Sequence, residues 1–300
     1  MKKSYKKYTK RDYMGLVYLL PWLLGLLIFQ LYPLISSFVY SFTDFNMYKS
    51  LNFIGFNNYI KLFTSDPDFY NSLKVTVLYT VMTVPGKIVF ALIIALILNL
   101  NIRGINVMRT VYYLPSLLGG SIAIAILWKL MFMSDGLING VLTTVGLPKV
   151  EWLGDPNVSL VTICLLEIWQ FGSSMVLFLA ALKQVPAELY EAAQIDGARR
   201  FRRFFTITLP TITPIIFFNL IMQTITALQS FTSAFVVTGG GPMKSTFVLG
   251  MKLYIDAFKN YKMGYASATS WVIFAMIMVV TLFLFRSSSG WVHYSDGEDL

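Results

Sequence analysis

The chain has 300 residues, of which 56% are hydrophobic and only 13% are charged. In soluble domains about a quarter of all residues are charged. This composition therefore excludes an ordinary soluble globular protein and predicts a polytopic membrane protein. The net charge of +9 also occurs in nucleic-acid-binding proteins, but its distribution along the chain argues against that class. The single cysteine, Cys164, excludes an intrachain disulfide and provides no cysteine cluster for a metal.

Long apolar stretches predict the membrane spans in chain order. A spanning helix needs about 20 mostly apolar residues. Six stretches meet this length, at 16–42, 72–99, 105–131, 158–182, 207–235 and 265–285. Because backbone polar groups within lipid must be paired, these spans are expected to be helices. The prediction is therefore an all-α membrane domain over 16–285, between an N-terminal tail at 1–15 and a C-terminal tail at 286–300.

The start of the chain imitates a secretory signal peptide, because MKKSYKKYTKR precedes a run of apolar residues. That run is too long for a signal peptide, and no small-residue cleavage site ends it. We therefore expect a retained first span. With the N-terminus inside, all eight arginines lie in inner segments or just within the flanking spans, whereas the outer segments carry lysines only. This asymmetry predicts that both termini are cytoplasmic.

Prolines lie within several predicted spans, at Pro21, Pro33, Pro85 and Pro115. Kinks that neighbouring helices tolerate are the favoured interpretation, and helices broken around a substrate are the alternative. The outer segment 243–262 is expected to form an amphipathic helix. Its apolar face carries Phe247, Met251, Tyr254 and Phe258, and its charged residues elsewhere around the axis are Lys252, Asp256 and Lys259.

The predicted fifth span carries a polar stripe. Its members fall within a narrow sector of a helix and are Asn219, Gln223, Thr226, Ser230 and Ser233. Such side chains either bond to another helix or line a wet cavity, and the sequence leaves both alternatives open. Neutral hydrogen-bonding groups beside aromatic rings suit a sugar. Trp169, Gln170 and Phe231 are the expected neighbours on this substrate path.

Two ionisable residues, Lys87 and Glu167, lie within predicted spans. Ionisable residues at such depth are candidates for function. The two differ in depth by about 9 Å along the helix axes, at 1.5 Å per residue. A direct pair is therefore the less favoured interpretation. A lysine that faces a water-filled cavity, or a glutamate bonded to a neighbouring helix, is favoured.

A charged insert at 183–206 separates the predicted fourth and fifth spans on the inner side. Pro186 suits the first turn of a helix, where its missing N–H has no partner to lose. Glu188 and Glu191 lie where the helix dipole favours acids, and Gly197 can end the helix with a positive φ. The residues predict a short helix at the membrane surface. On these residues alone, an ordinary loop with positive-inside arginines is favoured over a protein-docking helix.

The order of residues in this insert is similar to the EAA coupling loop of bacterial ABC importer permeases. It reads Glu191-Ala192-Ala193, then Asp196-Gly197-Ala198, and after a further eight residues Ile207-Thr208-Leu209-Pro210. Other stretches resemble the carbohydrate-uptake branch of that family. These are FIGFNNY at 53–59, RTVYYLP at 109–115, TGGGP at 238–242 and GYASA at 264–268. The resemblance covers roughly residues 15–295.

This resemblance implies a type I ABC importer permease fold, with six transmembrane helices and a cytoplasmic coupling helix that docks on an ATPase subunit. Carried over by position, the coupling residues are Glu191, Ala192, Ala193, Asp196 and Gly197, with Glu188 at the start of the same helix. The neighbouring arginines match no such motif and are assigned to lipid headgroups, with ATPase contact as the alternative. They are Arg199, Arg200, Arg202 and Arg203.

The resemblance also implies the partners of a saccharide importer in the bacterial cytoplasmic membrane. They are a second, homologous permease in a heterodimer, two ATPase subunits that hold ATP and Mg²⁺, and an extracytoplasmic solute-binding protein. The chain itself is expected to bind no cofactor, no metal and no nucleic acid, and to have no catalytic residue. The outer lysines permit an acidic sugar, but they equally suit acids on the binding protein; they are Lys244, Lys252, Lys259 and Lys262.

No segment of this sequence fits an ATP-binding P-loop. Gly86-Lys87 is followed by Ile88 within a span, and the glycines at 239–241 are expected to form a tight turn at a helix end. The alternative function is a stand-alone secondary transporter driven by an ion gradient. The small number of spans, the lack of a visible repeat and the scarcity of carboxylates at depth disfavour it. A membrane enzyme would need a cluster of His, Cys or carboxylate side chains, which the sequence lacks.

Overall fold

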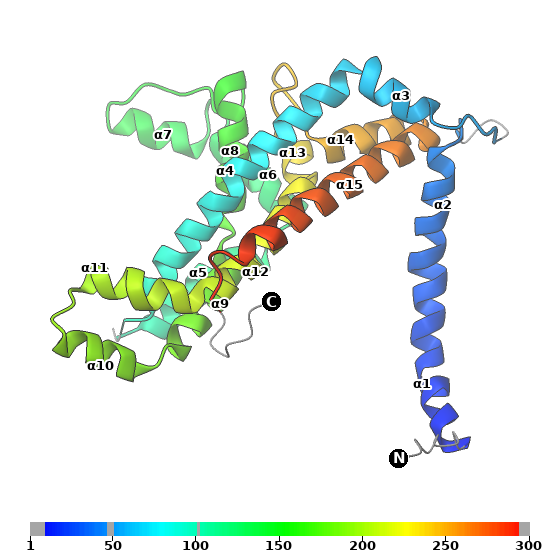
Figure 1. The fold of residues 1–300 in the computed structure, drawn as a ribbon. Coiled ribbons are helices and arrows are strands. Elements are labelled where there is room, and N and C mark those ends of the chain that lie inside the picture. The colour runs from blue at the N-terminus through cyan, green and yellow to red at the C-terminus, as the bar shows by residue number, and fades with distance from the viewer. Residues whose placement is uncertain (1–9, 47–50, 101–102, 294–300) are drawn as a thin grey trace. The chain divides into compact units, whose positions relative to one another are not determined.

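The computed structural model describes residues 10–46, 51–100 and 103–293, with side chains from Val17 onward. The described chain is almost entirely helical (Figure 1). It divides into two compact units, Met1–Ser65 with Ile255–Trp271, and Asp66–Tyr254 with Val272–Leu300. The tails predicted at 1–15 and 286–300 lie partly outside the described residues.

Five helical stretches among the described residues are long and apolar enough to cross a membrane, and a bent helix pair makes a sixth. The first is α1 (Lys10–Leu26), η1 (Leu27–Leu31) and α2 (Tyr32–Ser41). The next are α4 (Pro67–Leu98), α6 (Ile122–Phe132) with α7 (Leu137–Thr144), and the pair α8 (Pro156–Trp169) and α9 (Gly172–Gln184), bent by 46°. The last are α11 (Arg200–Arg203), η2 (Phe204–Thr208) and α12 (Leu209–Leu228), and α15 (Met263–Ser288). The all-α prediction is confirmed.

The third predicted span was wrong as a single helix over 105–131. The structure has α5 (Ile105–Leu117) and then α6, separated by residues 118–121. Gly120 in this break has φ +73°, a conformation that favours glycine. The two helices have different neighbours, because α5 packs on α9 and α6 packs on α13 (Thr232–Val237). Apolar residues on both sides of the break hid it from a reading of hydrophobicity.

The prolines do not end the helices that contain them. Pro21, Pro85 and Pro115 lie inside α1, α4 and α5. The π-helical turns η1 and η2 lie just before Pro33 and Pro210. A proline ring clashes with the carbonyl four residues earlier, and a widened turn moves that carbonyl aside. The interpretation as tolerated distortions is thus consistent with the structure, and the real breaks lie elsewhere.

The first unit is built around the corner that follows α2. Asn58, at the start of α3 (Asn57–Thr64), is buried and donates to the carbonyls of Ser41 and Thr43 at 2.9 and 2.8 Å. Gly264 lies against the same corner, where an added Cβ would be 2.2 Å from the Thr43 carbonyl oxygen. The motifs at 53–59 and 264–268 therefore have a structural role, because both close this corner.

The outer amphipathic helix is shorter than predicted. Residues 243–248 are not helical, and α14 (Leu249–Tyr254) and η3 (Ile255–Lys259) follow. The TGGGP segment turns the chain after α13, as expected, with Gly239 and Gly240 at positive φ. Two of the outer lysines that permit contacts with an acidic sugar or the binding protein, Lys252 and Lys244, form ion pairs within the chain. Lys252 lies 2.6 Å from Asp66 with its side chain 6% exposed, and Lys244 bonds to Asp68.

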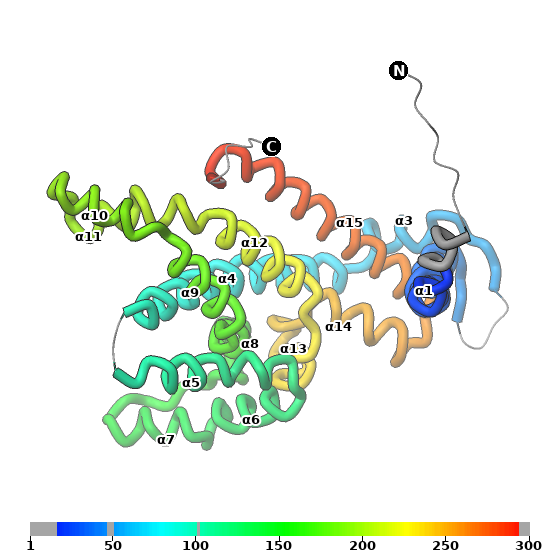
Figure 2. Tube along the Cα trace, turned by 90° about the horizontal axis from the view of Figure 1, so that it is seen from below, coloured from blue at the N-terminus to red at the C-terminus, as the bar shows by residue number. Residues whose placement is uncertain are grey.

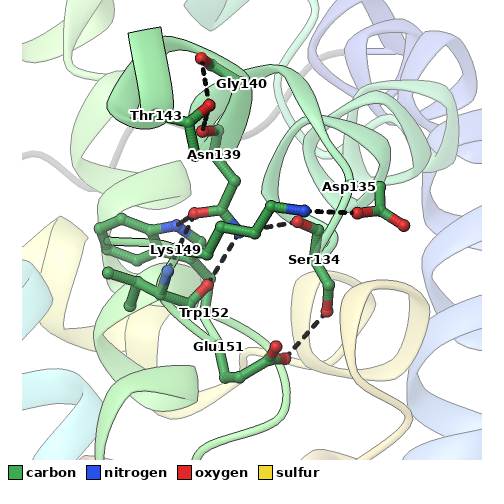
Figure 3. Close-up of polar contacts among 9 residues, drawn as sticks. Ser134, Asp135, Asn139, Gly140, Thr143, Lys149, Glu151 and Trp152 are labelled. Carbon is green, nitrogen blue, oxygen red and sulfur yellow. Dashed lines mark hydrogen bonds and ion pairs between the residues drawn. The ribbon is translucent and has the colours of Figure 1, made fainter. Parts of the chain in front are cut away.

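The segment after α6 forms a compact hairpin around Asn139, which is fully buried (Figure 3). Its amide nitrogen donates to the carbonyls of Ser134 and Val150, and its amide oxygen accepts from Val150 N and the Trp152 indole. All the hydrogen-bonding groups of this amide are engaged, which fixes the hairpin. The hydrogen bond from Lys149 to Asp135 raises the pKa of the lysine, but both side chains are exposed and contribute little to stability.

We predict that Gly172→Ala destabilises the protein by about 1–3 kcal/mol through overpacking. A Cβ at Gly172 would lie 2.7 Å from Ser116 Oγ and 2.8 Å from the Tyr112 carbonyl, so α5 and α9 would have to separate. The control is Gly140→Ala in α7, where nothing lies within 4 Å. Thermal unfolding in detergent checks the pair. Equal midpoints for the two variants would contradict the close packing of α5 on α9.

Candidate functional site

Three helix breaks of the second unit meet at one cavity of about 340 Å³. The break between α5 and α6 contributes Gly120, the bend between α8 and α9 contributes Gln170, and residues 229–231 between α12 and α13 contribute a third side. Helix α4 closes the cavity with residues from one face. Breaks leave polar backbone groups without helical partners, and in a membrane these are tolerated where they line a cavity.

The polar stripe largely faces this cavity. Its lining includes Gln223, Thr226, Ser230 and Ser233. Asn219 does not line the cavity; it is buried and donates to the Ile215 carbonyl of its own helix at 2.9 Å. Of the expected neighbours, Gln170 and Phe231 line the cavity. Trp169 does not line it and lies beside Trp128, with ring centroids 5.9 Å apart.

Hydrogen bonds join the stripe to other helices at the edge of the cavity. Gln223 donates to Ser174 of α9 at 3.2 Å, and Ser230 donates to the Tyr79 hydroxyl of α4 at 3.1 Å. Ser233 donates to Glu167 of α8 at 2.5 Å. The two alternatives for the stripe are therefore not exclusive, because the same side chains bridge helices and line the cavity.

Lys87 and Glu167 both line this cavity but form no ion pair in the described residues. Glu167 accepts the hydrogen bond from Ser233, whereas the Lys87 ammonium group donates no hydrogen bond within the described residues. Lys87 follows Tyr79 and Thr83 at intervals of four residues on α4, and all three line the cavity. The sequence analysis missed Tyr79 and Thr83, although this helical spacing is the signal that revealed the stripe in the fifth span.

The insert at 183–206 forms two short helices, α10 (Ala187–Ile195) and α11, which lie side by side in both views (Figures 1 and 2). Pro186 precedes the first helical residue instead of occupying the first turn. Gly197 ends α10 with φ +73°, as predicted. The N–H of Ala198 bonds to the Ala193 carbonyl and that of Gly197 to the Gln194 carbonyl, which forms a Schellman motif.

The surface of α10 is almost fully exposed. No residue of α10 is buried, and Glu188, Glu191, Ala192, Asp196 and Gly197 are all exposed, while Ala193 is half-buried. Ile195 and Phe201 are 87% and 82% exposed. These two apolar residues escaped the sequence analysis, although apolar side chains in a charged loop are themselves a signal for a partner.

One hydrogen bond ties α10 to the start of the fifth span. The hydroxyls of Tyr190 and Thr208 lie 2.7 Å apart, and Thr208 is buried in η2. Helix α12 continues from η2 and ends at Leu228, next to the cavity. The exposed loop and the cavity are thus joined by one continuous helical segment. Within the second unit α10 and α7 lie at opposite ends (Figure 1).

Among the described residues no group of three His, Cys, Asp or Glu side chains is placed to hold a metal ion. The cavity offers hydrogen-bonding amides and hydroxyls, the aromatic rings of Tyr79 and Phe231, and two opposite charges. This set can bind a polar molecule with apolar ring faces.

Comparison with known proteins gives matches over most of the chain. A family model described as the binding-protein-dependent transport system inner membrane component matches residues 69–293. The probable ABC transporter permease protein YesP of Bacillus subtilis (strain 168) is 45% identical over 100% of this chain and 97% of its own length. The lactose transport system permease protein LacF of Rhizobium radiobacter is 35% identical over 95% of this chain and 96% of its length.

A crystal structure of a bacterial ABC transporter involved in the import of the acidic polysaccharide alginate has a chain with the same fold. Its TM-score is 0.81 and its sequence identity is 25%, and the match covers 93% of this chain and 96% of that chain.

The cavity can be tested by thiol labelling, because the only native cysteine, Cys164, is 2% exposed and gives an unreactive background. We predict that Thr226→Cys reacts with a charged methanethiosulfonate reagent faster than Asn219→Cys by roughly an order of magnitude, because buried thiols are inert. The two positions lie on the same helix, and only Thr226 faces the cavity. Equal labelling rates would contradict the water-accessible cavity.

Proposed function

The chain belongs to the family of binding-protein-dependent transport system inner membrane components, and from that premise we propose that it is one permease subunit of an ATP-driven saccharide importer. Its membership confirms the resemblance to ABC importer permeases. It also confirms the prediction that the chain is a permease subunit and not an enzyme. The observation that carries the proposal is the exposed α10 loop, joined by one helical segment to a polar cavity.

The proposed ATPase contact is the surface of α10 with the turn at Gly197. The apolar side chains Ile195 and Phe201 would be covered by the docked subunit, which removes their surface from water. The coupling residues proposed from the EAA pattern share this surface; they are Glu188, Glu191, Ala192, Ala193, Asp196 and Gly197. Two such ATPase subunits would hold ATP and Mg²⁺ on the cytoplasmic side of the membrane. Both termini of this chain would lie on the same side.

A saccharide is supported as cargo by the cavity and by the relatives. The amides of Gln170, Gln223 and Gln229 are suited to sugar hydroxyls, and the ring of Phe231 to an apolar sugar face. The lactose permease and the alginate transporter are named for a neutral and an acidic saccharide. These names support a sugar and leave its charge open.

A displacement of α10 would be transmitted to the cavity through one hydrogen bond and one helical segment. Closure of the ATPases would shift α10, and the Tyr190–Thr208 hydrogen bond would pass that shift to η2 and α12. Because α12 ends at the cavity, its displacement would change the access of the cavity to either side of the membrane. A second permease would complete the translocation path, and a solute-binding protein would deliver the saccharide from outside.

The complex purified from its native membrane tests this proposal. We expect ATPase and second-permease chains to co-purify, and proteoliposomes with the solute-binding protein to import saccharide only when ATP is supplied inside. An ion gradient alone should drive no uptake. Ion-driven uptake without any ATPase chain would contradict the proposal and favour a secondary transporter.

We predict that Ala192→Trp removes most of the co-purifying ATPase and most ATP-driven import, because the bulky ring blocks close approach to α10. The side chain is exposed, so α10 should still fold. The matched control is Thr144→Trp, also an exposed helical position, on α7 at the opposite end of the second unit. Its ATPase content should stay unchanged. A normal ATPase content in the Ala192→Trp complex would argue against docking at this surface.

A further inference from the structure

The cavity is lined by a lysine side chain that is largely buried. Lys87 is 8% exposed and lines the cavity, yet it makes no hydrogen bond or ion pair in the described residues. Glu167 in the same cavity offsets part of this charge but accepts no hydrogen bond from Lys87, and an ammonium group without hydrogen-bond acceptors is costly at this depth of a membrane span. Such a residue persists where another molecule supplies the opposite charge.

The other charged group in the cavity is already engaged. Glu167 accepts the hydrogen bond from Ser233 and forms no ion pair with Lys87. It lowers the local positive potential without satisfying the ammonium donors of Lys87. The remaining lining offers neutral donors and acceptors, which include the hydroxyl of Thr83, next to Lys87 on α4.

We propose, resting on the proposed function, that the cargo is a saccharide bearing a carboxylate, and that Lys87 selects it by pairing with that group. One lysine offsets one negative charge, which fits a carboxylate better than a phosphate of charge about −1.5 to −2. The carboxylate of Glu167 orients the cargo, because it repels the acidic group toward Lys87. Hydroxyls of the same sugar ring can bond to Thr83, Gln170 and Gln229, which line the same cavity.

Matched sugars test the charge requirement. The complete transporter in proteoliposomes, with its binding protein, is supplied with uronate oligosaccharides that include alginate, mannuronate, glucuronate and galacturonate oligomers. Each oligomer is also supplied with its carboxyl groups reduced to primary alcohols, and lactose and maltose serve as neutral sugars. We expect import of an intact uronate oligomer and a clear preference for it over its reduced form.

Substitutions at Lys87 test the residue. Lys87→Gln should raise the KM for the uronate by about tenfold or more, since a hydrogen bond to a charged group is worth about 1.5–3 kcal/mol. It should change the KM for the reduced form much less, and Lys87→Arg should retain most of the preference. The control is Lys74→Gln, which removes the same charge from an exposed position on the same helix. Assembled complex is quantified for each variant.

Three outcomes overturn the inference. The first is import of neutral saccharides only, and the second is an equal KM for intact and reduced oligomers. The third is an equal loss of import for both sugars in Lys87→Gln and Glu167→Gln. This third result would show that the two residues pair with each other. In each case ATP-driven sugar import still stands. If no saccharide of either kind is imported, the proposed function itself fails.

Discussion

The membrane interior makes a polar group without a partner costly, and the polar groups of the second unit gather at its cavity. Three helix breaks bring free backbone groups to one place, and amides, hydroxyls and two charges gather around them. Ser233 and Glu167 satisfy each other there. The groups that stay unsatisfied, above all Lys87, indicate what a passing molecule must offer.

The two ends of the second unit differ in how firmly hydrogen bonds hold them. At one end Asn139 closes a hairpin with all its amide groups bonded. At the other end the α10–α11 loop exposes Ile195 and Phe201, and within the described residues α10 is held to the fifth span by the side-chain hydrogen bond of Tyr190. The hairpin around Asn139 is suited to a surface that stays fixed, whereas α10, held by few contacts, is suited to move when a partner moves. The proposed coupling function depends on this contrast.

The sequence predicted the elements whose signals are local. Apolar length marked the spans, Gly197 marked the end of α10, and helical spacing placed four members of the polar stripe on the cavity. It failed where contacts distant in the chain decide. The α5 and α6 helices on either side of the break at 118–121 pack on different helices, and Lys252 is buried by its pairing with Asp66. Neither feature can be read from a single segment.

Photo-crosslinking from Ile195 in native membranes tests the central claim most directly, because this side chain is 87% exposed and lies on the proposed docking surface. A photoreactive amino acid at this position is predicted to join the chain to an ATPase subunit, with a yield that changes when ATP is added. Crosslinks to lipid alone, or to no protein in the assembled transporter, would contradict the assignment of α10 as the coupling helix.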